Sequence, residues 1–208
     1  MDTIKSKYHE TLAATVIKNL EKRQMEGYYC PTVEDAEKLA FSFLKDGQTI
    51  SFGGSMTLEE TGMLTALRHD PSIHLIDRST AKTPDETKKM YHDALSSDVY
   101  FMSTNAITTG GELVNIDGTG NRVAALIYGP ETVVILAGMN KIAANVDEAL
   151  SRVHNVATAQ NCIRLDKKTP CAITGACADC LSPDCICNQV VITRRSGIKG
   201  RIKVLLIG

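Results

Sequence analysis

The sequence predicts an α/β protein whose mostly parallel sheet is covered by helices on both faces. Short, unbroken apolar runs at Thr49–Phe52, Val99–Met102 and 132–137 alternate with segments of helical periodicity. Such runs are typical of strands that are buried on both faces, as in parallel sheets. The composition is globular, with 43% hydrophobic and 23% charged residues among 208. This length suits one core with a small appendage.

The first elements are expected to be a long helix, a short strand and a second helix. Apolar residues recur near a helical period from Ile4 to Leu20, which predicts an amphipathic helix over residues 2–26. A strand at 28–30 follows. Thr32 then begins a helix whose first turn carries acidic residues, and these interact favourably with the helix dipole.

Capping signals place the next helices. Thr57 and Glu60 form a capping box, which predicts a helix through Arg68. Thr83, followed by a proline and an acidic residue, predicts a helix to Leu95. The remaining expected elements are strands at 73–76, 112–116, 190–193 and 202–207 and helices at 121–127 and 146–158. The last two strands, which glycines separate, are expected to form a hairpin at the edge of the sheet.

This order of elements divides the chain into three parts. Residues 1–160 are expected to form the α/β core with its N-terminal helix. Residues 161–190 are a cysteine-rich, metal-binding segment, and residues 191–208 are expected to complete the sheet. The formal net charge is −1, which does not favour nucleic-acid binding. No apolar run is long enough to span a membrane, and residues 1–24 do not resemble a signal peptide, so we expect a cytoplasmic protein.

Loops rich in glycine and small polar residues follow several predicted strands. In open α/β sheets, ligands bind beyond the carboxyl ends of the strands. Glycines let backbone N–H groups approach an anion closely, although the first loop, taken alone, is more typical of a tight turn before a helix cap. The candidate ligand-binding residues in these loops are Gly53, Gly54, Ser55, Asn105, Gly118, Asn121 and Lys141. All of these loops should lie on one edge of one sheet, and they predict a site there for a small anionic substrate or ligand.

Asp117 and Arg122 are the candidate catalytic residues. An arginine can hold a carboxylate or a phosphate through two parallel hydrogen bonds. Asp117 could act as a base, or it could serve only as a structural partner of Arg122. The sequence leaves both roles open.

Six of the seven cysteines lie between positions 162 and 187. In a reducing compartment, clustered thiols favour metal binding over disulfides. Cys177 and Cys180 have the Cys-x-x-Cys spacing that lets two thiolates of one turn reach one metal. Four thiolates can hold zinc or a [4Fe–4S] cluster. Because zinc ribbons usually contain two such pairs and only one is present, the pattern favours iron–sulfur. A redox dithiol is a third interpretation. The five histidines show no ligand spacing and are interpreted as structural.

With these motifs in view, the chain resembles the LUD-domain family, and specifically its lactate-utilisation protein C (YkgG-type) members. The resemblance runs over most of the chain. Its most specific stretches are 103–108, 111–125, 138–142 and 169–188.

The resemblance implies a fold and a set of site residues. The family is similar in fold to the ribose-5-phosphate isomerase, glucosamine-phosphate isomerase and CoA-transferase group. That group binds sugar phosphates or acyl-CoA at the loops after its strands. Residues 53–55 resemble the group's anion loop, and 115–121 resemble its second ligand loop, which adds Asn115 to the candidate ligand-binding residues. The cysteines that match the family motif are Cys171, Cys177, Cys180 and Cys187. The roles of Cys162 and Cys185 stay open.

Three functional hypotheses follow. In the first, the chain is an iron–sulfur component that oxidises L-lactate or a related hydroxy acid beside iron–sulfur partner proteins, as a subunit of an oxidoreductase system. In the second, it binds a sugar phosphate or an acyl-CoA-type ligand, with Asp117 as the base, Lys141 at the phosphate and the cysteines around a structural metal. In the third, it is a metal-dependent regulatory subunit. A homo-oligomer is compatible with each.

Overall fold

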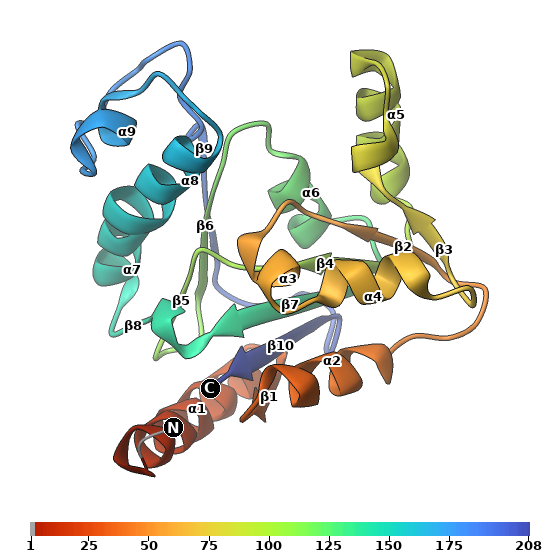
Figure 1. Ribbon diagram of the computed structural model, residues 1–208. Helices are drawn as coiled ribbons and strands as arrows, with labels where there is room; N and C mark the ends of the chain where they lie inside the picture. The colour runs from red at the N-terminus through yellow and green to blue at the C-terminus, as the bar shows by residue number, and fades with distance from the viewer. Residues whose placement is uncertain (1–2) are drawn as a thin grey trace.

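The computed structural model describes residues 3–208 and contains two sheets (Figure 1). Residue 2, where the first helix was expected to begin, lies outside this range. All pairings within the six-stranded main sheet are parallel, which confirms the predicted class. In spatial order, its strands are β1 (Glu26–Cys30), β10 (Ile202–Ile207), β7 (Thr132–Gly138), β4 (Val99–Met102), β2 (Thr49–Phe52) and β3 (His74–Ile76).

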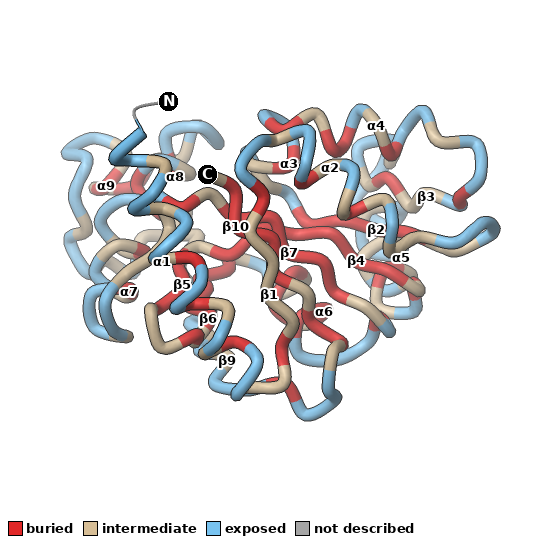
Figure 2. The backbone as a smooth tube through the Cα atoms, turned by 90° about the horizontal axis from the view of Figure 1, so that it is seen from below, coloured by how far each residue is buried: buried red, intermediate tan, exposed pale blue. Residues whose placement is uncertain are grey.

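Helices cover both faces of the main sheet because its strands point apolar side chains alternately to either side. Val133 and Ile135 of β7 pack with one group of helices, and Val134 and Leu136 pack with another. The first group is α1 (Thr3–Lys22), α6 (Asn121–Ile127) and the end of α5 (Pro84–Ala94). The second group is α2 (Val33–Phe41), α3 (Met56–Glu60) and α4 (Met63–His69). Figure 2 shows the resulting buried layer through the middle of the molecule.

A smaller, mixed sheet lies beside the carboxyl ends of β4 and β7 (Figure 1). Its strands, in order, are β8 (Ile142–Ala143), β5 (Ala106–Thr108), β6 (Leu113–Asp117) and β9 (Gln189–Thr193). Beside it runs one long helical segment made of α7 (Val146–Arg152), the π-helical η3 (Val153–Thr158) and α8 (Ala159–Arg164). The cysteine-rich part follows and contains α9 (Pro170–Thr174). Within the described residues there are also two short 3₁₀ turns, η1 (Arg78–Thr80) after β3 and η2 (Met139–Lys141) after β7.

Two predictions about elements were wrong. The last two strands do not form a hairpin, because β9 pairs with β6 in the small sheet while β10 lies between β1 and β7. Backbone hydrogen bonds from Ser196 and Gly200 to the α1–β1 turn carry the chain from one sheet to the other. The helix expected from Thr57 to Arg68 is interrupted at Gly62, whose φ is 73°, and its true N-cap is Ser55.

Gly111 offers a test of how tightly the small sheet is packed on α1. Its φ is 88°, and a Cβ atom there would lie 2.9 Å from the backbone of Asn19 and Leu20. We expect Gly111→Ala to lower the free energy of unfolding by about 2–4 kcal/mol, from left-handed strain and backbone displacement together. Gly47 is the matched control, since its φ is 79° but nothing lies within 4 Å. Urea titration should show a loss of about 1 kcal/mol for Gly47→Ala. Equal losses would contradict close packing at Gly111.

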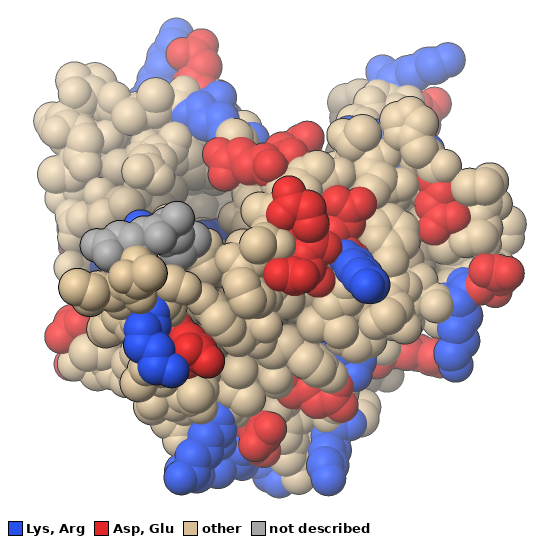
Figure 3. All heavy atoms as spheres, turned by 60° about the horizontal axis from the view of Figure 1, so that its bottom comes forward, with Lys and Arg blue, Asp and Glu red and all other residues tan. Residues whose placement is uncertain are grey.

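Two further observations concern membrane spans and the charge on one face of the molecule. No helix in the range 3–208 combines the length and the apolar character that crossing a membrane requires. On the face drawn in Figure 3, Lys and Arg side chains are scattered among acidic and uncharged ones. That face therefore has no broad basic area of the kind that binds nucleic acid.

Candidate functional site

The predicted ligand loops meet, but they do not all belong to one sheet. Residues 53–55 and 103–105 follow β2 and β4 of the main sheet, and 138–141 begin at the last residue of β7. The loop from Asp117 to Arg122 instead follows β6 of the small sheet, so the expectation of a single sheet edge was wrong. Arg122 still joins the loops, because its side chain lies against Gly53 and reaches the loop after β4.

Arg122 is buried, and the protein uses its whole hydrogen-bonding capacity. A guanidinium has five N–H donors. Its five partners are Asp117 Oδ2 (3.2 Å), the Ser103 carbonyl (3.0 Å), Asn115 Oδ1 (2.6 Å), Asn105 Oδ1 (2.9 Å) and the Ile116 carbonyl (2.7 Å). Burial is the main effect on its pKa and lowers it, and Asp117 opposes the shift. A ligand could bind this guanidinium bidentately only by displacing some of these partners.

The other residues of this loop are also engaged with the protein. Asp117 Oδ1 accepts a hydrogen bond from the Gly120 backbone at 2.8 Å, so both of its oxygens have partners. Asn188 of the cysteine-rich part donates to the Gly118 carbonyl at 3.0 Å, which ties the two regions together. Asn121 is the first residue of α6. The catalytic roles predicted for Asp117 and Arg122 stay predictions.

One buried polar group in this region has no partner. Asn115 is fully buried, and its Nδ2 makes no hydrogen bond, although its Oδ1 accepts from Arg122. The Oδ1 of Asn105 is fully used, since it accepts from Arg122 and from the Ile116 backbone. Buried amide donors are normally satisfied. Asn115 therefore has a donor to spare beside Arg122.

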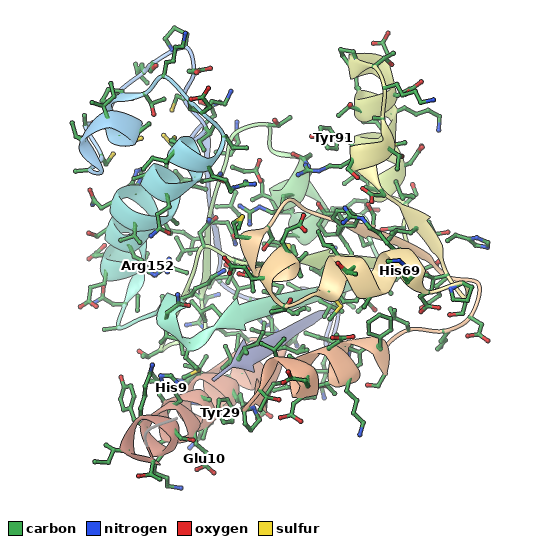
Figure 4. All side chains as sticks on the ribbon, in the orientation of Figure 1. His9, Glu10, Tyr29, His69, Tyr91 and Arg152 are labelled. Atoms are coloured by element: carbon green, nitrogen blue, oxygen red, sulfur yellow. The ribbon has the colours of Figure 1, made fainter. Side chains whose placement is uncertain are left out.

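The Gly53-Gly54-Ser55 loop is shaped by hydrogen bonds and by a cation that the sequence interpretation did not include. The Gly53 N–H donates to the Phe101 carbonyl at 2.9 Å, and Ser55 caps α3. The guanidinium of Arg78 lies against Gly54, where a Cβ atom would collide with its Nη2. Arg78 also donates to the hydroxyl of Tyr91, a side chain that projects from α5 (Figure 4). Arg78 follows β3, so the strand-end rule could have found it.

Lys141 lies where the loops after β4 and β7 meet the start of α3. Its ammonium donates to Thr57 Oγ1 at 2.7 Å and to Ser103 Oγ at 2.6 Å. Burial lowers its pKa to about 8; Arg152 and Arg122 add to this, and Glu60 opposes it.

Arg152 is a second cation here that sequence reasoning missed. It projects from α7 (Figure 4) and donates to the Asn105 carbonyl at 2.6 Å and to the Asn140 carbonyl at 3.1 Å. Burial lowers its pKa. No local signal marks it, because its loop partners are distant in sequence.

All six C-terminal cysteines line one cavity of about 400 Å³. Cys162 lies on α8 and Cys171 on α9, whereas the other four belong to the irregular stretch after α9. Cys30 lies apart, buried in β1, where burial raises its pKa to about 11. The structure thus brings together the four predicted ligands and the two cysteines whose roles were open. The cavity-lining cysteines are Cys162, Cys171, Cys177, Cys180, Cys185 and Cys187.

The thiols contact one another and a few polar neighbours. The Sγ atoms of Cys185 and Cys187 are 2.9 Å apart, and burial, followed by Cys185, raises the pKa of Cys187 to about 12. Cys177 Sγ lies 3.7 Å from Nδ1 of His154, which also lines the cavity. The sequence interpretation treated His154 as structural. The spacing of His154 and Cys162, eight residues apart on one helical segment, was the available signal.

Comparison with known proteins identifies the family. The LUD domain model matches residues 13–207. The chain belongs to the LUD domain family. A crystal structure of a DUF162 family protein from Deinococcus radiodurans is similar in fold, with a TM-score of 0.56 at 12% identity over 96% of this chain and 98% of that chain. The eIF2B delta protein of Chaetomium thermophilum matches with a TM-score of 0.35 at 20% identity, over 53% of this chain and 48% of that one. Curated protein sequences give no match.

The cavity of this LUD domain can be tested against the two predicted metal centres. Within residues 3–208, no three Cys, His, Asp or Glu side chains surround one point closely enough to hold a single metal ion. Zinc needs four ligand atoms within about 2.0–2.3 Å of one point. In a four-iron cluster each thiolate binds a different iron, so the sulfurs surround a larger volume. The donor set of the cavity, six thiols and the imidazole of His154, is chemically suited to either centre.

Proposed function

We propose that this LUD-domain protein is the iron–sulfur component of a system that oxidises L-lactate or a related small hydroxy acid. The observation that carries the proposal is the single cavity lined by all six C-terminal cysteines. Thiolates are the ligands of iron–sulfur clusters. The family resemblance to lactate-utilisation proteins supports the choice of substrate.

The favoured ligands are Cys171, Cys177, Cys180 and Cys187, with a [4Fe–4S] cluster as the favoured centre. When bound, such a cluster accepts and releases single electrons. The chain's own residues hold and orient the thiols: Thr169 Oγ1 lies 3.3 Å from Cys171 Sγ, and His154 lies beside Cys177. Since iron binds thiolates, loading this site releases protons.

Electrons need a route to a partner protein, and the cavity lies close to the surface. Leu181 lines the cavity and is fully exposed, and Ile173 of the neighbouring α9 is 85% exposed. Exposed apolar side chains are common at contacts between proteins. They favour docking of an iron–sulfur partner at this end of the molecule.

Anaerobic purification followed by an absorption spectrum and metal analysis tests the proposal. We expect a broad brown absorbance that dithionite bleaches, with iron and sulfide at about four each per chain. In Cys180→Ser, both iron and absorbance should fall sharply, because a four-thiolate set loses one ligand. In the control Cys30→Ala, they should persist, since Cys30 lies outside the cavity. A colourless protein with about one zinc would contradict the proposal.

A second candidate function is binding of a sugar phosphate or an acyl-CoA-type ligand, with the cysteines around a structural metal. The observation in its favour is the set of cations beside the strand-end loops, Arg78 against Gly54 and Lys141 against Thr57. It predicts sugar-phosphate binding that Asp117→Ala abolishes and Cys180→Ser leaves intact. Unchanged binding in Asp117→Ala would count against it.

A further inference from the structure

Three cations meet at the loop after β4. Arg122 donates to the Ser103 carbonyl, Lys141 to the Ser103 hydroxyl and Arg152 to the Asn105 carbonyl. Arg122 and Arg152 lie close enough to Lys141 to lower its pKa. The three belong to different elements, α6, η2 and α7, so only the folded chain brings them together.

Of these three charges, the described residues balance only that of Arg122. Asp117 forms an ion pair with Arg122 at 3.2 Å. Among the ion pairs of the described residues, none involves Lys141 or Arg152. Glu60 acts on Lys141 only as a weaker, longer-range charge and is itself exposed. Removing a charge from water is costly unless an opposite charge offsets the loss, so two partly buried cations lack a counter-ion.

Unused donors accompany the unbalanced charge. An ammonium has three N–H groups, and Lys141 directs two of them to hydroxyl oxygens. The Nδ2 of Asn115 is fully buried without a partner, and the same Asn115 is bonded to the Arg122 that holds Ser103. Excess positive charge and spare donors at one place are the properties of an anion site.

We propose that Lys141 and Arg152 bind the carboxylate of a small hydroxy or oxo acid, with the Asn115 amide beside it. The inference rests on the proposed function for the reaction that this acid undergoes. Thr57 and Ser103 orient the ammonium. Arg122 is a positioning residue, since all its donors hold the loops rather than the ligand.

The surrounding loop favours a carboxylate over a phosphate. The Gly53 N–H is already bonded to Phe101, and α3, which follows the loop, is five residues long and capped by Ser55. Few backbone donors are therefore left to cradle a dianion. One ammonium and one guanidinium suit the two oxygens of a single carboxylate.

Isothermal titration of the whole protein, purified anaerobically, tests the site with L-lactate, pyruvate and inorganic phosphate. We expect both acids to bind the wild type and to bind Lys141→Met at least about tenfold more weakly, the size of one charge-assisted hydrogen bond. Lys141→Arg should retain most of the affinity. Lys88→Met, which removes an exposed lysine of α5, is the control and should change nothing.

The pH dependence provides a second measurement. The Lys141 pKa of about 8 means that the ammonium is charged below that pH and loses its proton above it. Wild-type affinity should therefore fall as pH rises through about 8. In Lys141→Arg it should stay level, because a guanidinium remains charged. The fixed charges of Arg152 and Arg122 do not change over this range.

Several results would overturn the inference. They are no binding of either acid, equal binding by Lys141→Met, or tighter binding of phosphate than of lactate. If Lys141→Met fails to fold, Arg152→Met replaces it with the same expected loss. Iron analysis of the same samples separates this inference from the proposed function: acid binding without a cluster keeps the site and removes the redox role, whereas a cluster without acid binding does the opposite.

Discussion

Replacing Arg122 with methionine is expected to lower the free energy of unfolding by about 3–5 kcal/mol, which is the cost of removing one partner of a buried ion pair. Arg122 is 8% exposed, and its guanidinium joins the loops after β4 and β6. Methionine has a similar apolar stem but no donors. The substitution would leave the Asp117 carboxylate and two main-chain carbonyls in a poorly hydrated place without their partner.

Urea titration measures this loss against two comparisons. Arg164→Met removes an exposed arginine that donates to Asn161 one turn away, and it should cost less than about 1 kcal/mol. In the Arg122→Met background, Asp117→Asn should restore part of the stability, because it removes the unpaired charge. A loss below about 1 kcal/mol in Arg122→Met, or no recovery in the double variant, would show that Arg122 does not hold the loops.

The parts of the fold that local patterns determine could be predicted from the sequence. The structure places β2, β4 and α6 at their expected residues. The two strands are short apolar runs because helices cover the sheet on both faces. The pattern of such a run does not depend on which strand lies beside it. The cap of α2 at Thr32 was likewise visible, since its hydroxyl accepts from the Asp35 backbone three residues on.

The pairing of strands could not be predicted, because it depends on contacts between distant residues. The run Ile202–Ile207 looks the same in a hairpin and in a central parallel strand. Only its neighbours, Glu26–Cys30 and the strand at 132–138, decide between them. The two-residue β8 is too short to show any period.

The candidate sites show the same division. The cysteines were visible because they cluster within one segment, and Lys141 was visible because it follows an apolar strand. Arg152 and His154 were missed because they lie on a helix and reach their sites only through tertiary packing. The structure also changes the interpretation of Arg122, since a buried arginine with five protein partners cannot be told from a free one by its sequence neighbours.

Removing the proposed cluster is expected to open the cysteine-rich stretch while leaving the sheets folded. Residues 175–188 contain neither helix nor strand, and few hydrogen bonds hold them to the rest of the chain. A ligand present at a hundred times its dissociation constant stabilises the state that binds it by about 2.7 kcal/mol. The equilibrium constant for opening that state then falls on the order of a hundredfold. Amides in this stretch should therefore exchange with solvent on the order of a hundredfold faster after chelation.

Hydrogen exchange followed by mass spectrometry can separate this stretch from the core. Peptides that cover β7 and β10 should exchange equally in the loaded and the chelated protein, because these strands pack in the buried main sheet without contacting the cavity. Cys180→Ser should resemble the chelated protein, and Cys30→Ala should resemble the loaded one. Equal exchange of residues 175–188 with and without metal would mean that the six thiols hold no centre that orders them. Faster exchange in β7 as well would mean that the centre supports the whole fold rather than only its own ligands.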